Sequence, residues 1–119
     1  MIDKQMIGKV GENAVCRYIL DKGMKLLARN YRAQKGEIDL IAQDEDTLVF
    51  IEVKTRSNAN YGTAADAVGY KKQQMIIKTA QCFIAEHSLY DSNVRFDVAE
   101  VALNKKQSSV HYIMDAFML

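Results

Sequence analysis

The sequence predicts one α/β domain, in which a mixed β-sheet is flanked by helices in the order αβββαβ(β). Three observations predict this class. The chain has 119 residues, of which 49% are hydrophobic and 26% charged, as is typical of one globular domain over residues 1–119. Two stretches carry apolar residues at helical spacing, and several others are rich in Ile, Val, Leu and Phe. Helical and strand stretches that alternate along a chain favour a sheet covered by helices.

The first element is predicted to be a helix over about residues 3–21. Its apolar residues recur at the three-and-four spacing of an amphipathic helix: Met6, Ile7, Val10, Ala14, Val15, Tyr18 and Ile19. Gly23 is expected to end this helix. Residues 25–32 precede a Gln34-Lys35-Gly36 turn, and we interpret them as the first strand.

The clearest strands are residues 37–43 and 48–55, which are rich in β-branched and other apolar residues. Residues 44–47, which read Asp-Glu-Asp-Thr, separate them and have the composition of a turn. Because the connection is short, the two strands are predicted to form a hairpin.

The second half of the chain is predicted to add helices and two strands. A loop over residues 57–63 leads to a helical region, which Gly69 is expected to divide into a short helix and a long one. Residues 94–103 alternate as a strand, and residues 110–117 form a weaker last strand.

Acidic residues are placed together by the hairpin. With a four-residue turn, Asp39 lies opposite Glu52, with Cβ atoms about 5 Å apart. Glu37 then lies opposite Lys54 on the same face. Both faces are largely apolar, so we expect the hairpin to be central in the sheet and covered.

Two carboxylates in a partly desolvated sheet raise each other's pKa unless a cation lies between them. A divalent metal is the simplest such cation, and the hard oxygens of Asp39 and Glu52 suit Mg²⁺ or Mn²⁺, which also binds waters and substrate phosphate. Lys54 could orient or deprotonate a water, or neutralise charge that develops on phosphorus. The alternative is an ion-pair ladder on a solvated sheet face, which the apolar neighbours weaken.

The segments GEIDLIA at residues 36–42 and LVFIEVKTR at residues 48–56, followed by Tyr61-Gly62, resemble the small bacterial endonuclease-like proteins of the YraN type. That family is similar in core to archaeal Holliday-junction resolvases and to the PD-(D/E)xK nuclease superfamily. Gly11-Glu12 and the RFDV segment at residues 95–98 are supporting matches, and the resemblance covers nearly the whole chain.

The resemblance implies a restriction-endonuclease-like fold and a set of site residues. It implies that Asp39 and Glu52 are metal ligands, that Lys54 is the catalytic lysine, and that Glu12 is a further acidic member of the catalytic metal site. For Glu12 the alternative is an exposed helix acid. Ile38 stands where the superfamily motif has Pro, and this departure leaves the ligands untouched.

The function implied is a metal-dependent endonuclease that hydrolyses DNA phosphodiester bonds, for example at branched or repair and recombination intermediates. A metal-activated water would attack the phosphodiester in line. The alternative is a non-catalytic nucleic-acid-binding or assembly module that keeps the fold. A protein-interaction domain is a third possibility.

Basic residues around the hairpin are candidates for contacts to DNA phosphates. Four of them flank the acidic strands and three polar residues open the long helix: Arg29, Arg32, Lys35, Arg56, Lys71, Lys72 and Gln74. Their alternative roles are solubility and a solvated helix start. Tyr31 and Tyr61 could stack on an unpaired base, or could fill an edge of the core.

The composition also bears on compartment and partners. The formal net charge is +1, but residues 37–52 hold six acidic and no basic residues, between two basic segments. Cys16 and Cys82 lie far apart with no further ligand nearby, so we expect buried thiols in a cytoplasmic protein, without a zinc site or an organic cofactor. No apolar run is long enough for a membrane span. Apolar residues of the long helix could also form a homodimer face.

Overall fold

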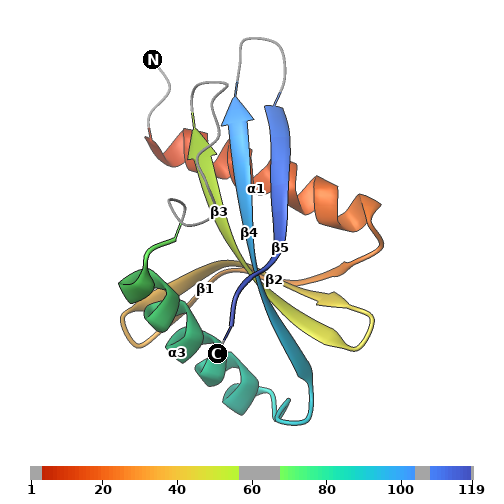
Figure 1. The fold of residues 1–119 in the computed structure, drawn as a ribbon, viewed down its shortest axis with the longest axis vertical. Coiled ribbons are helices and arrows are strands. Elements are labelled where there is room, and N and C mark those ends of the chain that lie inside the picture. Colours follow the sequence, from red (N-terminus) through yellow and green to blue (C-terminus); the bar gives the residue numbers. More distant parts are fainter. Residues whose placement is uncertain (1–3, 57–67, 104–107, 119) are drawn as a thin grey trace.

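Five strands form one mixed sheet, and a helix covers part of each face (Figure 1). The computed structural model describes residues 4–56, 68–103 and 108–118. In chain order the elements are α1 (Lys4–Asp21), β1 (Lys25–Ala33), β2 (Gly36–Asp44), β3 (Thr47–Arg56), α3 (Tyr70–Glu86), β4 (Asn93–Leu103) and β5 (Ser108–Phe117). This order confirms the α/β, restriction-endonuclease-like class that the sequence predicts.

The strands lie in the sheet in the order β1-β2-β3-β4-β5. All neighbours are antiparallel except β3 and β4, which are parallel. Parallel strands need a long crossover, and α3 lies in the connection between these two. The crossover returns the chain past the sheet, so the first turn of α3 lies beside β3, where Lys72 contacts Glu52.

The hairpin of β2 and β3 has the predicted register but a shorter turn. Gln43 pairs with Leu48, as expected from the sequence. The predicted turn of residues 44–47 is wrong, because Asp44 and Thr47 already pair and only Glu45-Asp46 remain unpaired. Glu45 has a φ of 55°, the left-handed backbone that a two-residue turn requires.

Two apolar clusters lie on opposite faces of the sheet. The cluster under α3 is centred on Ile41, Phe50, Phe83 and Phe96. The cluster under α1 contains Val15, Cys16, Ile19, Met24, Leu40, Ala42, Val49, Ile51, Ala99 and Val101. The hairpin contributes to both, so the expectation of a central, covered hairpin is confirmed.

The predicted apolar stripe of α1 is buried only in its second half. Val15 and Ile19 are fully buried, whereas Met6 is 55% exposed and Val10 44% exposed. Cys16 and Cys82 are both free thiols; Cys16 is buried as expected, whereas Cys82 is only partly buried.

The other predicted elements are found within one or two residues of their expected bounds. Gly69, expected to separate two helices, directly precedes α3 with an extended backbone. The predicted loop at residues 57–63, which includes Tyr61, lies outside the described residues, as does nearly all of the expected short helix before Gly69.

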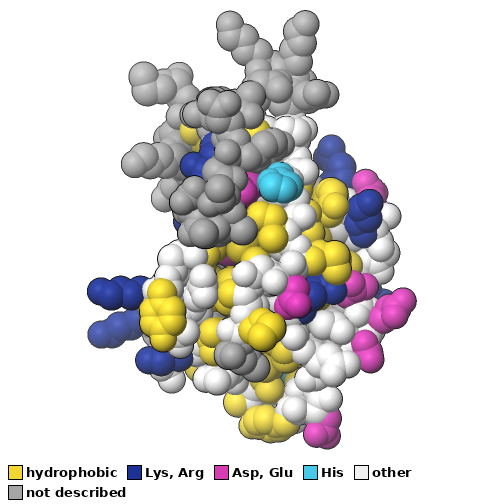
Figure 2. Space-filling view, in the orientation of Figure 1, with side chains coloured by type: hydrophobic (Ala, Val, Ile, Leu, Met, Phe, Trp, Pro, Cys, Tyr) yellow, Lys and Arg dark blue, Asp and Glu magenta, His cyan; other side chains and the backbone are white. Residues whose placement is uncertain are grey.

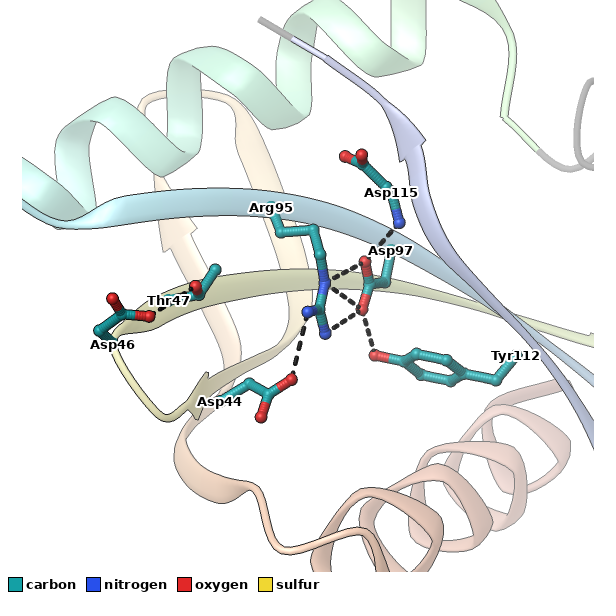
Figure 3. Close-up of polar contacts among 7 residues, drawn as sticks. All are labelled: Asp44, Asp46, Thr47, Arg95, Asp97, Tyr112 and Asp115. Atoms are coloured by element: carbon teal, nitrogen blue, oxygen red, sulfur yellow. Dashed lines mark hydrogen bonds and ion pairs between the residues drawn. The ribbon is translucent and has the colours of Figure 1, made fainter.

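A buried charged network joins β4, β5 and the end of β2 (Figure 3). Asp97 is fully buried and accepts hydrogen bonds from Arg95, from the Tyr112 hydroxyl at 2.6 Å and from the Asp115 N–H at 2.8 Å. Arg95 also contacts Asp44 at 3.2 Å. Burial and the hydrogen bond to Asp97 raise the pKa of Tyr112. Every oxygen of the Asp97 carboxylate thus has a partner, as a buried charge requires.

Candidate functional site

Asp39 and Glu52 form a carboxylate pair at the point where β2 and β3 separate. The paired register of the two strands ends at Leu40 and Ile51, one step before these acids. Beyond that point the Val53 N–H donates to Asp39 Oδ2 at 2.8 Å, in place of a ladder hydrogen bond. Glu52 is only 5% exposed. The sequence-predicted pair is therefore brought together and largely removed from water.

The protonation of Asp39 reflects this crowding. Burial is the largest cause that raises the pKa of Asp39, and the hydrogen bond with Glu52 and the charge of Glu52 raise it further, to about 7. The Val53 N–H and the Lys72 ammonium act in the opposite direction. Near neutral pH this pair therefore holds a proton for part of the time, unless a stronger cation replaces it.

Two lysines lie near the pair. Lys72, from the first turn of α3, places its Nζ 3.3 Å from Glu52 Oε2 and stays 48% exposed. Lys54 follows Glu52 by two residues on β3, is partly buried, and pairs in register with Glu100 of β4. The contact made by Lys72 was predicted only as a general phosphate contact, because its partner lies 20 residues away in sequence.

Glu12 is held next to the pair but does not join it. Asn30 Nδ2 lies 3.3 and 3.2 Å from the two Glu12 oxygens, and Arg29 lies 3.5 Å away. Asn30 lies on β1 at the position opposite Asp39, between two registered pairs of β1 and β2. Within residues 4–56, 68–103 and 108–118, no three His, Cys, Asp or Glu side chains are arranged to hold a metal ion. The metal role of Glu12 stays a prediction.

A second buried acid, which the sequence analysis did not single out, lies further along the sheet. Glu100 is fully buried, with its Oε2 3.6 Å from Arg56 and its Oε1 3.7 Å from His111. His111, which shows no partner at ligand spacing in the sequence, lies directly opposite Glu100 in the register of β4 and β5. Lys54 lies opposite the same acid on the other neighbouring strand. Alternation along β4 could have indicated an inward-facing acid here.

The remaining predicted phosphate contacts fall into different environments. Arg32 pairs with Glu37 at 3.7 Å, so Glu37 contacts β1 and not Lys54 as its predicted register suggested. Lys71 is exposed and Gln74 partly exposed on α3, and Lys35 is exposed in the β1–β2 turn. Lys78 of α3, absent from the predicted set, lines a hollow together with Lys35.

Tyr31, a candidate for base stacking, packs into the core edge. Its ring meets Phe83 edge-on with centroids 5.2 Å apart. Burial is the largest cause that raises its pKa to about 12, and a hydrogen bond with Glu86 also contributes. The alternative of an aromatic that fills an edge of the core describes this side chain.

The donor set suits a small divalent cation. Asp39 and Glu52 offer hard oxygens from adjacent strands, and Mg²⁺ commonly takes one or two carboxylates and completes its shell with water and substrate phosphate. The raised pKa of Asp39 is the signature of a site that lacks positive charge. These residues could therefore hold such an ion.

The family follows from comparisons with known proteins. The model of the uncharacterised protein family UPF0102 matches residues 11–101. The chain belongs to the UPF0102 family. A UPF0102 protein of Caldanaerobacter subterraneus is 41% identical over 98% of both chains. One of Clostridioides difficile is 44% identical over 92% of this chain and 95% of its own. The predicted membership of the YraN-type family is thereby confirmed.

Among solved structures, Pyrococcus furiosus SfsA in complex with Ca²⁺ aligns with a TM-score of 0.39 and 14% identity. The alignment covers 96% of this chain, which spans 64% of the SfsA chain. In the described part of the chain, no helix has the length and apolar character that crossing a membrane requires.

Proposed function

We propose that this protein is a metal-dependent endonuclease that hydrolyses DNA phosphodiester bonds, with branched or repair intermediates as substrates. The observation that carries the proposal is the Asp39–Glu52 pair, two desolvated carboxylates in hydrogen-bond contact on adjacent strands. A structural ion pair has no need of two acids side by side, and their mutual repulsion destabilises the folded chain. A site for a divalent cation gives this arrangement a purpose.

In the proposed reaction, Asp39 and Glu52 hold Mg²⁺ or Mn²⁺, and Glu12 is a further acid of this site, positioned by Asn30. The bound ion would polarise the phosphate and lower the pKa of water toward neutrality. The Val53 N–H fixes the orientation of the Asp39 carboxylate. Water adds to phosphorus as the P–O bond to the leaving oxygen breaks, and Lys54 neutralises the negative charge that develops.

Cations outside the pair supply contacts to the DNA backbone. Lys72 lies 3.3 Å from Glu52, so a phosphate at the pair lies within reach of its ammonium group. Arg56 extends the same strand beyond Lys54 and contacts Glu100. These charges attract DNA without reading its sequence, which agrees with a structure-selective substrate.

The test is a cleavage panel of linear, flapped and four-way DNA in Mg²⁺ and in Mn²⁺. Glu52→Gln removes one negative oxygen at nearly constant shape and is expected to lower the cleavage rate by about 100-fold or more. Glu45→Gln, in the exposed turn of the same hairpin, is the matched control and is expected to cleave like the wild type.

A thermal melt with and without Mg²⁺ separates this proposal from a non-catalytic binding module. The enzyme is expected to be stabilised by Mg²⁺, and Asp39→Asn is expected to lose that stabilisation. DNA binding without cleavage, unchanged by Asp39→Asn and accompanied by no Mg²⁺ effect on the melt, would sink the proposal in favour of the module.

A further inference from the structure

A second basic feature lies where the β1–β2 turn meets α3. Hollows of about 340 and 380 Å³ lie on either side of this turn, and Lys35 lines both of them. Lys78 of α3 lines the first hollow, and Arg32 of β1 lines the second. In Figure 2, Lys and Arg side chains project together at the left edge, where Figure 1 places α3 and the adjacent strand turn. We call Arg32, Lys35 and Lys78 the turn–helix cations.

Close packing fixes the turn on the helix. A Cβ atom at Gly36 would lie only 2.1 Å from Thr79 Oγ1, so the backbone of the turn lies directly against α3. Thr79 is buried, and its hydroxyl is held by the Met75 carbonyl at 2.8 Å. Lys35 and Lys78 are therefore held at one place by a rigid junction, although they come from different elements.

The helix connects this junction to the carboxylate pair. Lys71 and Lys78 are seven residues apart on α3 and share one face of it, and Lys72 beside Lys71 contacts Glu52. With a rise of 1.5 Å per residue, Lys71 and Lys78 are about 10 Å apart along the axis. One strand of a duplex places a phosphate about every 3.4 Å along its axis, so this separation corresponds to about three phosphate steps.

The charges along this path lack acidic partners. Lys35, Lys71 and Lys78 are all exposed and make no ion pair with the described residues. The only acid on α3 is Glu86, at its far end. A row of exposed, unpaired ammonium groups beside an acidic cation site complements a polyanion whose scissile phosphate lies at that site.

We propose that the turn–helix cations form a second phosphate-binding site, which holds the DNA backbone about three nucleotides from the phosphate that is cleaved. The DNA strand then runs along α3, from the Asp39–Glu52 pair to the hollow between Lys35 and Lys78. This inference rests on the proposed nuclease function. It adds a direction for the bound strand and a minimum length for the DNA on one side of the cleavage point.

The test measures DNA binding by fluorescence anisotropy in EDTA, where cleavage is absent, over a range of salt concentrations. The probes are a single-stranded oligonucleotide and a four-way junction. The double variant Lys35→Ala, Lys78→Ala is expected to raise Kd about 10-fold or more at low salt and to reduce the salt slope by about 1.8, or 0.9 for each lost phosphate contact. The double variant Lys9→Ala, Lys25→Ala, with the same charge change away from the junction, is the control and is expected to bind nearly as the wild type does.

Each outcome bears on one proposal or on both. An equal loss of affinity in the two double variants would mean a general charge effect, and would overturn the second phosphate site while leaving the nuclease proposal intact. A wild-type chain that does not bind DNA even at low salt would overturn both. If the turn–helix variant alone binds weakly and its circular dichroism matches the wild type, the second site is supported.

Discussion

Asp39 is the residue at which the fold and the proposed chemistry meet. A carboxylate whose pKa is raised to about 7 is protonated under conditions in which an ordinary aspartate, with a pKa of 3.8, is charged. Between these two values the folded chain binds a proton that the unfolded chain has released. The contribution of Asp39 to folding stability is therefore complete below about pH 4 and is lost as the pH rises through 7.

This gives a prediction for the metal-free protein. In EDTA, the free energy of unfolding of the wild type relative to Asp39→Asn is expected to fall by up to about 1.4 kcal/mol per pH unit from about pH 4 to about pH 7. Urea denaturation at several pH values measures it. Asp91→Asn, an exposed acid, is the control and is expected to show the pH profile of the wild type. Identical profiles for Asp39→Asn and the wild type would contradict the raised pKa.

Asp97 shows what a buried acid does when its partners are complete. Asp97→Asn leaves the Arg95 guanidinium, whose side chain is only 15% exposed, with less charge to neutralise it. We expect a loss of about 3 kcal/mol in the free energy of unfolding, as for other broken buried pairs. Tyr112→Phe removes one hydrogen bond to the same carboxylate and is expected to cost less, about 2 kcal/mol.

Chemical denaturation of the two variants and the wild type measures both losses. If Asp97→Asn were as stable as the wild type, the network of Figure 3 would not contribute to stability. A larger loss for Tyr112→Phe than for Asp97→Asn would contradict the central place of the carboxylate.

At the scale of elements, the approach of α1 to β3 depends on one glycine. A Cβ atom at Gly11 would lie 1.8 Å from Thr55 Oγ1, whereas one at Gly8 meets nothing within 4 Å. In an open helix position, Gly→Ala stabilises a protein by about 0.5–1 kcal/mol. The two positions of the same helix are therefore expected to respond with opposite signs.

Gly8→Ala is expected to raise the melting temperature and Gly11→Ala to lower it, the latter by about 1–3 kcal/mol in the free energy of unfolding. Differential scanning calorimetry measures both. The double variant Gly11→Ala, Thr55→Ala relieves the contact and is expected to recover part of the loss. A stabilised Gly11→Ala protein would show that α1 can move away from β3 at no cost.

The sequence could predict most of these elements because their signals are local. Runs such as residues 48–55 contain enough β-branched and aromatic residues to indicate a strand, and alternation set the register of the hairpin correctly. The turn was predicted too long because Asp44 and Thr47 are residues typical of turns, although here they pair. Composition cannot separate a turn residue from the last polar residue of a strand.

For the whole molecule, the limits of prediction lie in contacts between distant segments. Asp39 and Glu52 could be paired from the sequence because a short turn joins their strands. Lys72 meets Glu52 through the crossover, Asn30 meets Glu12 across the α1–β1 connection, and Glu100 meets Arg56 through parallel strands. No spacing rule reports such contacts, since they depend on how the elements pack.

The charge distribution also acquires a meaning only in three dimensions. The net charge of +1 describes a nearly neutral chain, and three of its negative charges belong to the predicted site acids Glu12, Asp39 and Glu52. The turn–helix cations lie at the outer end of α3, whose first turn reaches that site. The near-neutral total therefore contains a separation of charge that suits a polyanionic partner.

Both edges of the sheet are irregular, and this bears on how copies of the chain can associate. In β1 the pairing with β2 shifts at Leu27, and in β5 the pairing with β4 shifts near Asp115, which has a φ of 56°. Bulged edge strands make poor templates for adding a further strand. Neither edge therefore offers a straight row of backbone groups, which protects the chain from edge-to-edge aggregation and leaves side-chain surfaces for any specific contact between copies.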